Sequence, residues 1–221
     1  MAGPRPRLRA GDPLRPDRVT GMARLKLGLT GTIGSGKSTA LSLLSRQGWH
    51  TVRTDDIARE EMERFAVVAE LRGRWGEGVF HEDGAIDRRA IGRIVFADPG
   101  ELDWLESVLH PLVRDRWTKV LEEDDVNDVA VEIPLLFEKK LANAFDKVVS
   151  VDCPETLQAE RLKKRGLSAG DIEARKRRQW SAAEKNARAD FVLSNCGTIP
   201  FLEKQIIRMS GRLRGAANPP S

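Results

Sequence analysis

The hydrophobic pattern of the chain alternates between short apolar runs and longer stretches whose apolar residues recur at helical spacing. The short runs predict buried strands at 25–30, 50–53, 129–133, 147–151 and 191–194. The periodic stretches predict helices at 39–47 and 199–212, a helix opened by Pro154, and mostly helical chain from 58 to about 120. Because helices separate most of these short strands, we expect an α/β fold whose parallel sheet is covered by helices on both faces.

The stretch between the second and third predicted strands contains three local signals. One long helix is expected first, because four apolar residues share a face: Ala58, Met62, Phe65 and Ala69. Asp98-Pro99-Gly100-Glu101 is typical of a helix start, with a capping aspartate, a proline and an acid in the first turn. His110-Pro111 predicts a further helix start. We therefore expect a helical insertion in the α/β core.

The segment between the first strand and the first helix carries the clearest chemistry. It reads Gly31-Thr32-Ile33-Gly34-Ser35-Gly36-Lys37-Ser38-Thr39 and fits the phosphate-binding pattern G-x-x-x-x-G-K-[ST]. Glycines allow a turn that aims backbone N–H groups at phosphate oxygens, and the helix N-terminus adds positive potential. Lys37 is expected to reach the β- and γ-phosphates, and the Ser38 hydroxyl to hold Mg²⁺. The nucleotide-binding residues of this loop are predicted to be Gly34, Ser35, Gly36, Lys37, Ser38 and Thr39, and the ligand ATP or another nucleoside triphosphate.

Composition is compatible with this interpretation. The 221 residues are 40% hydrophobic and 32% charged, which suits one soluble α/β domain with insertions. No apolar run approaches the roughly 20 residues that span a bilayer, so no membrane segment is expected. Cys153 and Cys196 lack metal-ligand or disulfide spacing, which favours a cytoplasmic protein.

Positive charge is concentrated in two places. Residues 1–22 hold five arginines and two aspartates, +3 of the net +4, together with four of the eleven prolines. We expect 1–23 to be a disordered basic leader, and Met22 is an alternative start. Residues 161–178 hold eight Lys or Arg against Asp171 and Glu173. Beside a phosphate-binding loop, this stretch favours a basic lid over the solvated helical face that such runs usually form.

Three classes of nucleotide-binding protein compete: a small-molecule kinase, a GTPase switch and a nucleic-acid-dependent ATPase. The chain has no Asn-Lys-x-Asp guanine signature and no clear strand ending in Asp-Glu, which disfavours the second and third classes. A kinase needs little more than the loop, a base near the acceptor hydroxyl and a basic cover over the phosphates. We therefore favour a kinase and regard nucleic acid as an unlikely partner.

Asp55 is the favoured catalytic base. It follows the second strand, and ligands of doubly wound sheets bind beyond the carboxyl ends of the strands. An acid there can orient and deprotonate the attacking hydroxyl. Asp55 and Asp56 are also both suited to cap the next helix, which leaves one of them free. Glu132 ends another strand and either reaches the Mg²⁺ shell through water or is a plain surface acid.

Several motifs in order resemble the dephospho-CoA kinase family over about 25–214. They are Gly28-Leu29-Thr30-Gly31 with the following loop, Asp55 with Ala58 and Arg59, His110-Pro111 with Arg114, Pro134-Leu135-Leu136-Phe137-Glu138, spaced arginines ending in Gln179, and Asn195 with Gly197. The loop alone is generic, but the ordered set is specific. Two positions depart from the family pattern. Thr32 replaces a loop glycine at a variable position, and Arg53 replaces the first acid of an Asp-x-Asp pair.

The resemblance implies transfer of the ATP γ-phosphate to the ribose 3′-hydroxyl of dephospho-CoA, the last step of coenzyme A synthesis. It makes Asp55, Lys37, Arg161 and Arg165 catalytic. It adds Asn195 and Gly197 to the nucleotide contacts and assigns the acceptor to His110, Arg114, Glu138 and Arg175. A nucleoside or nucleotide kinase is the alternative acceptor class, and a nucleic-acid-binding ATPase the more distant one.

The expected organisation divides the chain by role. The nucleotide-binding core comprises 24–57, 126–154 and 181–214. A helical acceptor-binding insertion spans 58–125 and a lid spans 155–180, with a frayed tail at 215–221. The protein is expected to be a monomer or a weak homo-oligomer.

Overall fold

The computed structural model describes residues 24–123 and 127–216. The predicted leader, 1–23, lies outside the described residues, as does the predicted tail except for residues 215 and 216. Those two residues end the last helix, so the helix predicted to stop at 212 continues to Ala216.

A parallel sheet of five strands forms the centre of the described chain, and it confirms the five predicted strands. The strands are β1 (Lys26–Thr30), β2 (His50–Arg53), β3 (Val129–Glu132), β4 (Lys147–Asp152) and β5 (Phe191–Ser194). Their order in the sheet is β2-β3-β1-β4-β5, and every neighbouring pair is parallel. β3 therefore lies between β1 and β2, with Lys26 opposite Val129 and His50 opposite the same residue. This order brings the carboxyl ends of β1, β2 and β3 together at one edge of the sheet.

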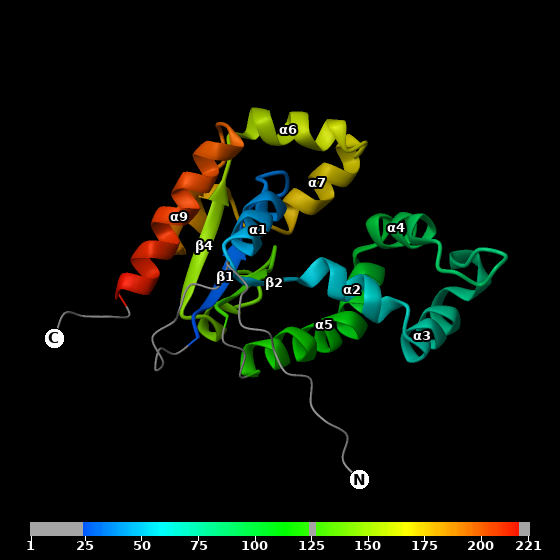
Figure 1. Ribbon diagram of the computed structural model, residues 1–221. Coiled ribbons are helices and arrows are strands. Elements are labelled where there is room, and N and C mark those ends of the chain that lie inside the picture. The colour runs from blue at the N-terminus through cyan, green and yellow to red at the C-terminus, as the bar shows by residue number, and fades with distance from the viewer. Residues whose placement is uncertain (1–23, 124–126, 217–221) are drawn as a thin grey trace, which may run out of the picture.

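Helices cover both faces of the sheet (Figure 1). They are α1 (Lys37–Arg46), α2 (Thr54–Met62), α3 (Phe65–Trp75), α4 (Arg88–Ala97), α5 (Pro99–Glu122), α6 (Glu155–Lys164), α7 (Ala169–Arg177), α8 (Ala182–Arg188) and α9 (Ile199–Ala216), with short 3₁₀ helices η1 (Gly76–Val79) and η2 (Ala142–Ala144). α1 and α9 bury apolar residues against one face, among them Leu44 and Ile206. On the other face Val113 and Trp117 of α5 pack on Val131. The fold class predicted from the sequence is confirmed.

The insertion between β2 and β3 has a small core of its own, but its first part differs from the prediction. The expected long helix is wrong: α2 ends at Met62, and Arg64 takes an extended conformation before α3 begins. This break turns Phe65 into solvent, where it is 90% exposed. Val67 and Leu71 of α3 enter the core instead, against Ile91 of α4.

The predicted helix start at His110-Pro111 is also wrong, because α5 runs unbroken from Pro99 to Glu122 with Pro111 inside it. Proline removes one helical hydrogen bond. Buried residues continue at helical spacing on both sides of it, at Leu105, Leu109, Val113 and Trp117. Their burial holds the helix together across the gap. The start at Asp98 is confirmed, since its carboxylate accepts the Gly100 N–H at 2.7 Å.

The segment predicted as a lid, 155–180, contains α6 and α7, which form an arm at the top of the view in Figure 1. Ser168 begins α7 through a reciprocal capping box with Asp171. α7 contains no buried residue. Contacts at its ends and on its arginine side chains therefore fix the position of this helix.

Candidate active site

The phosphate-binding loop is shaped by glycines and supported from β5. Gly34 and Gly36 have φ angles of 78° and 96°, a region that favours glycine. A Cβ on Gly36 would overlap the side-chain nitrogen of Asn195. Asn195 is buried and donates from this nitrogen to the Ser35 carbonyl at 2.8 Å. Asn195 thus supports the loop from below, while the predicted neighbour Gly197 is exposed.

Lys37, the first residue of α1, is the buried cation of the loop. Its ammonium donates to the carbonyls of Gly31 at 3.0 Å and Thr32 at 3.1 Å. Burial lowers the Lys37 pKa to about 8, an effect that the Glu132 carboxylate opposes. α1 begins at Lys37, two residues earlier than predicted. The Lys37 ammonium is thus held against the carbonyls of the phosphate-binding loop.

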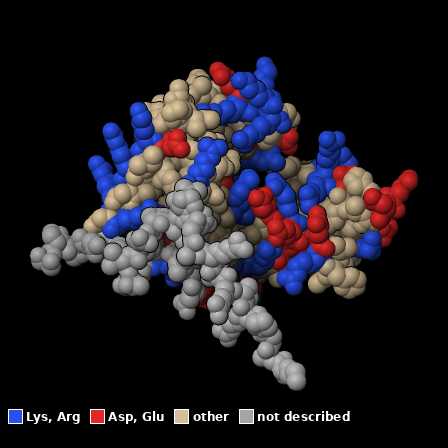
Figure 2. Space-filling model, in the orientation of Figure 1, with Lys and Arg blue, Asp and Glu red and all other residues tan. Residues whose placement is uncertain are grey.

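A cavity of about 400 Å³ opens over the loop. The phosphate loop, the ends of β2 and β3, and the lid contribute its walls: Ile33, Gly34, Gly36, Lys37, Ser38, Arg53, Asp55, Glu132, Pro134, Leu135, Leu162, Arg165, Leu167, Arg175, Arg178 and Gln179. Basic side chains gather over α6 and α7 and around the adjoining hollow (Figure 2). The cavity therefore combines an anion-binding floor with a cationic cover.

Asp55 lies in this cavity, but the predicted cap is wrong. α2 begins at Thr54, and no side chain caps it. The Thr54 hydroxyl instead donates to the Glu132 carbonyl at 3.0 Å and joins the helix start to β3. Asp56 pairs with Arg59 and, at 3.4 Å, with Arg53. Asp55 is left facing the cavity with Lys37 and Ser38.

Glu132 is buried, which excludes the second of its two predicted alternatives, a plain surface acid. Burial raises the pKa of its carboxyl, although Lys37 and Arg53 oppose the rise. Arg53, the position that departs from the family pattern, approaches Glu132 Oε2 at 3.6 Å. An arginine thus accompanies the buried acid at the strand ends.

The three predicted lid arginines occupy different surroundings. Arg161 donates to the carbonyls of Ser35 at 3.3 Å and Asn195 at 3.0 Å, so it contacts the protein backbone behind the loop. Arg165 and Arg175 line the cavity. Arg161 therefore supports the loop in this conformation, whereas the other two face the space above it.

The lid also contacts the insertion through two of its arginines. Arg175 stacks over the Phe96 ring of α4, 4.6 Å from its centroid. Arg178 pairs with Glu106 of α5 at 2.6 Å. Both arginines line the cavity, so the contacts that join lid to insertion are made at its rim.

His110 and Arg114 lie in a second cavity of about 550 Å³ on α5, together with Glu106 and Lys139. Glu106 binds Arg178 on one oxygen, and the other lies 3.2 Å from Lys139 and 3.7 Å from His110. Burial opposes the charge on Glu106, but its contacts with Arg178 and Lys139 outweigh burial and lower the Glu106 pKa. Glu106 thus connects the two cavities. Sequence reasoning missed it because it looks like an ordinary acid on an amphipathic helix.

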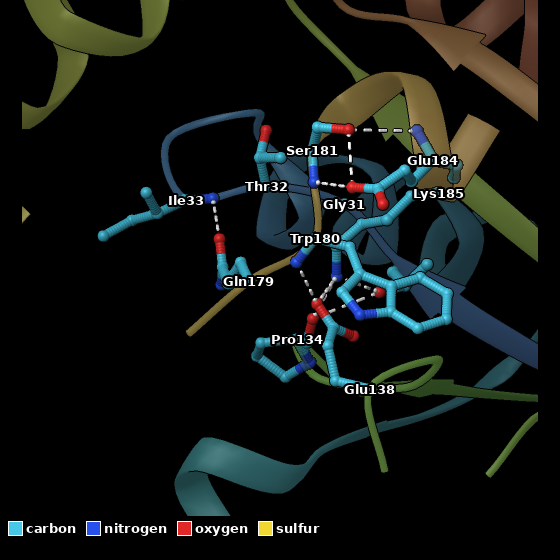
Figure 3. Close-up of polar contacts among 12 residues, drawn as sticks. Gly31, Thr32, Ile33, Pro134, Glu138, Gln179, Trp180, Ser181, Glu184 and Lys185 are labelled. Carbon is cyan, nitrogen blue, oxygen red and sulfur yellow. Dashed lines mark hydrogen bonds and ion pairs between the residues drawn. The ribbon is translucent and has the colours of Figure 1, made fainter. Parts of the chain in front are cut away.

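Glu138 and Lys185 form a buried ion pair beside the main cavity, at 2.9 Å (Figure 3). Glu138 also accepts the Trp180 N–H at 2.8 Å, and it is outside the lining of both cavities described above. Lys185 is absent from the sequence predictions because it carries no motif. One signal was its position in a short helix just before the last strand, where one face must be buried.

The geometry defines a class: a P-loop kinase for a small acceptor, with a parallel sheet, a phosphate loop, an acid at the neighbouring strand end and an arginine-rich lid. A family model described as dephospho-CoA kinase matches residues 25–200. A dephospho-CoA kinase of Synechococcus sp. (strain CC9605) is 42% identical over 176 residues, covering 78% of this chain and 85% of the relative. The chain belongs to the dephospho-CoA kinase family and is an ATP-dependent kinase.

Two solved structures share the fold of this chain. A Thermus thermophilus protein has 37% identity and a TM-score of 0.73, with coverage of 86% of this chain and 98% of the other. Dephospho-CoA kinase from Campylobacter jejuni, 23% identical, has a TM-score of 0.63 with coverage of 87% and 98%, which supports the fold.

Among the described residues, no helix is long and apolar enough to cross a membrane.

Proposed function

We propose that this enzyme transfers the γ-phosphate of ATP to the ribose 3′-hydroxyl of dephospho-CoA, giving coenzyme A and ADP, with Asp55 as the base. The observation that carries the proposal is the shared cavity, where Asp55, Lys37 and Arg165 surround one space. An acceptor hydroxyl there meets a carboxylate on one side and cations on the other. This is the arrangement that phosphoryl transfer requires.

Asp55 orients the 3′-hydroxyl and takes its proton as the new O–P bond forms. The role suits it because Asp55 contributes no side-chain cap to α2 and faces the cavity. Asp56, one residue on, is occupied by Arg53 and Arg59. Asp55 thus serves the reaction, whereas Asp56 stabilises the local structure through its ion pairs.

Lys37 and the loop N–H groups bind the phosphates, and Arg165 and Arg175 neutralise the charge that develops on the transferring group. The loop carbonyls hold the Lys37 ammonium in place before the nucleotide arrives. Donors fixed in advance stabilise a transition state without reorganisation. Arg161 contributes indirectly, by holding the loop through the Ser35 carbonyl.

Mg²⁺ fits the oxygen donors of this cavity. The Ser38 hydroxyl and the Glu132 carboxylate line it, and Glu132 Oε2 is a buried oxygen without a hydrogen-bond partner. Residues 24–123 and 127–216 contain no cluster of three or more His, Cys, Asp or Glu suited to a metal. Few protein ligands plus substrate phosphates are the usual environment of Mg²⁺. Ser38 would hold the ion directly and Glu132 would contact it through water, and the ion would supply positive charge beside the phosphates.

The insertion binds the acceptor in this proposal, and residues 155–180 form the lid. His110 and Arg114 line the α5 cavity, which connects to the main cavity through Glu106 and Arg178. Burial lowers the His110 pKa, so a neutral imidazole is available as a hydrogen-bond partner.

The enzyme acts in the cytoplasm, in line with two free cysteines, as a monomer or weak homo-oligomer.

The test is a coupled assay of ADP release with ATP and Mg²⁺ over an acceptor panel: dephospho-CoA, AMP, adenosine, dTMP and no acceptor. Turnover with dephospho-CoA alone is expected. Turnover with a nucleoside or nucleotide would keep the loop chemistry but change the acceptor. ATP hydrolysis indifferent to every acceptor would reject the kinase assignment and favour a nucleic-acid-dependent ATPase.

A further inference from the structure

A buried ion pair lies just outside the catalytic cavity. The Lys185 side chain of α8 is 0% exposed and that of Glu138, after β3, is 9% exposed. Removing two charges from water is costly, and their mutual attraction offsets that cost only when further hydrogen bonds satisfy both groups. The partners that supply those bonds therefore indicate which segments the pair joins.

The partners of the Lys185 ammonium lie under the phosphate loop. Lys185 donates to the Pro134 carbonyl at 2.7 Å (Figure 3). It also approaches the Thr30 hydroxyl at 3.4 Å. Thr30 is the last residue of β1, directly before the loop. Pro134 lines the catalytic cavity. One ammonium thus joins the end of β1 to the chain that follows β3.

The partner of Glu138 lies at the end of the lid. Its Oε1 atom accepts the Trp180 N–H at 2.8 Å, while Oε2 is buried without a hydrogen-bond partner. The preceding side chain, Gln179, accepts the N–H of Ile33 in the phosphate loop, also at 2.8 Å. Two consecutive residues that end the lid are therefore held by the core, one from the ion pair and one from the loop itself (Figure 3).

We infer that Lys185 is a positioning residue for phosphoryl transfer: through Glu138 it anchors the end of the lid against the phosphate loop. The inference rests on the proposed function. α7 has no buried residue, so this end anchor, together with the contacts of Arg175 with Phe96 and of Arg178 with Glu106, sets where the two arginines lie over the cavity. Glu138 then acts through Trp180 rather than on the acceptor.

The test separates positioning from stability with Lys185→Met and the double variant Lys185→Met/Glu138→Leu. The single variant leaves Glu138 buried and unpaired, so its Tm is expected to fall by roughly 10 °C. The double variant removes both charges and is expected to recover most of that loss. Its kcat is expected to stay about 30-fold below wild type, with KM for ATP and dephospho-CoA within about threefold, because the lid arginines are misplaced while ground-state binding persists.

A control outside the cavity is Lys147→Met/Asp190→Asn, a partly exposed pair with a similar set of contacts. Asp190 likewise accepts from one lysine and one backbone N–H, those of Lys147 and Val148, but this pair lies at the start of β4, away from the cavity. Its kcat is expected to remain at the wild-type value. Gln179→Ala removes the second anchor without leaving a buried charge and is expected to lower kcat in the same way, even if the double variant does not fold.

A wild-type kcat in the folded double variant would overturn the inference. If the double variant does not fold, a wild-type kcat in Gln179→Ala would overturn it instead. Amide hydrogen exchange across 175–181 tests the anchor without any acceptor: faster exchange is expected in the double variant but not in the control. Unchanged exchange would also overturn it. A wild-type enzyme inactive with dephospho-CoA would instead reject the proposed function, and the exchange experiment would still decide whether the anchor exists.

Discussion

The floor of the catalytic cavity and the lid above it are built in opposite ways. Lys37 and Glu132 of the floor are less than 9% exposed and lie at the ends of elements that pack in the sheet core. In the lid, α7 buries no residue and α6 buries only Gln158 and Leu162. The floor is thus fixed by burial, and the lid by a few polar contacts.

This difference separates two requirements of phosphoryl transfer. Groups that bind phosphate and receive a proton work best when held in place before the substrate arrives. Groups that enclose the reaction must move, and mobile elements come from the part of a structure with few buried contacts. Changes to the floor should therefore abolish turnover, whereas changes to the lid should reduce it by degrees.

The largest effect is expected from Asp55→Asn, which keeps the shape of the side chain but removes its ability to accept the hydroxyl proton. kcat should fall by about 10³-fold, while ATP affinity measured by calorimetry stays within a few-fold. Asp56→Asn is the matched control, since Asp56 pairs with Arg53 and Arg59, and it should change kcat only slightly. Near-normal turnover of Asp55→Asn would remove Asp55 from the role of base.

Lys37→Met comes next. The apolar side chain fills the buried space but cannot bind the phosphates or the carbonyls of Gly31 and Thr32. A loss of about 10²–10³-fold in kcat is expected, with weaker ATP binding, because the cation contacts both ground and transition states. Steady-state kinetics over a range of ATP concentrations measure both the loss in kcat and the change in KM for ATP. An effect on KM alone would show that Lys37 serves binding only.

Arg165→Ala tests the lid and should have a smaller effect. Arg165 lines the cavity at the end of α6 and acts mainly when the lid is closed. kcat should fall by about 10–30-fold, more than ATP affinity does. Lys164→Ala is its control, because Lys164 is exposed and outside the cavity lining. Equal losses in both variants would indicate a general charge effect instead of a specific contact.

Glu106→Gln should have the smallest effect. It weakens the contact with Arg178 that joins the lid to α5. A partly exposed ion pair contributes modestly, so kcat/KM for dephospho-CoA should fall by about 3–5-fold. Glu101→Gln, also on α5 but paired with Arg74 inside the insertion, should leave that value unchanged. If Glu106→Gln also leaves kcat/KM for dephospho-CoA unchanged, the contact between lid and insertion has no part in catalysis.

The sequence predicted the floor better than the insertion, and the physical reason is locality. The phosphate loop, its strand and its helix depend on glycine conformations and apolar spacing within a dozen residues. The position of Asp55 follows from the rule that ligands bind beyond strand ends. The five strands were predicted correctly because each is a short, isolated apolar run.

What the sequence could not predict depends on tertiary contacts. Pro111 was interpreted as a helix start because its local signal is the same inside a helix whose burial outweighs one lost bond. Phe65 appeared to continue an apolar face until the break before α3 turned it outward. Lys185 and Glu138 lie 47 residues apart, and nothing in either neighbourhood specifies the other. The catalytic roles of the site residues remain predictions until the variants are measured.

The position of β3 between β1 and β2 sets the order of events during synthesis. β1 pairs first with residue 129, about 100 residues further along the chain, so the nascent chain cannot complete this part of the sheet while the insertion is being made. At ribosomal rates that interval is roughly 5–20 s. During that interval neither β1 nor β2 has its β3 neighbour. Translation speed across the insertion should therefore influence how much of this enzyme reaches its native state.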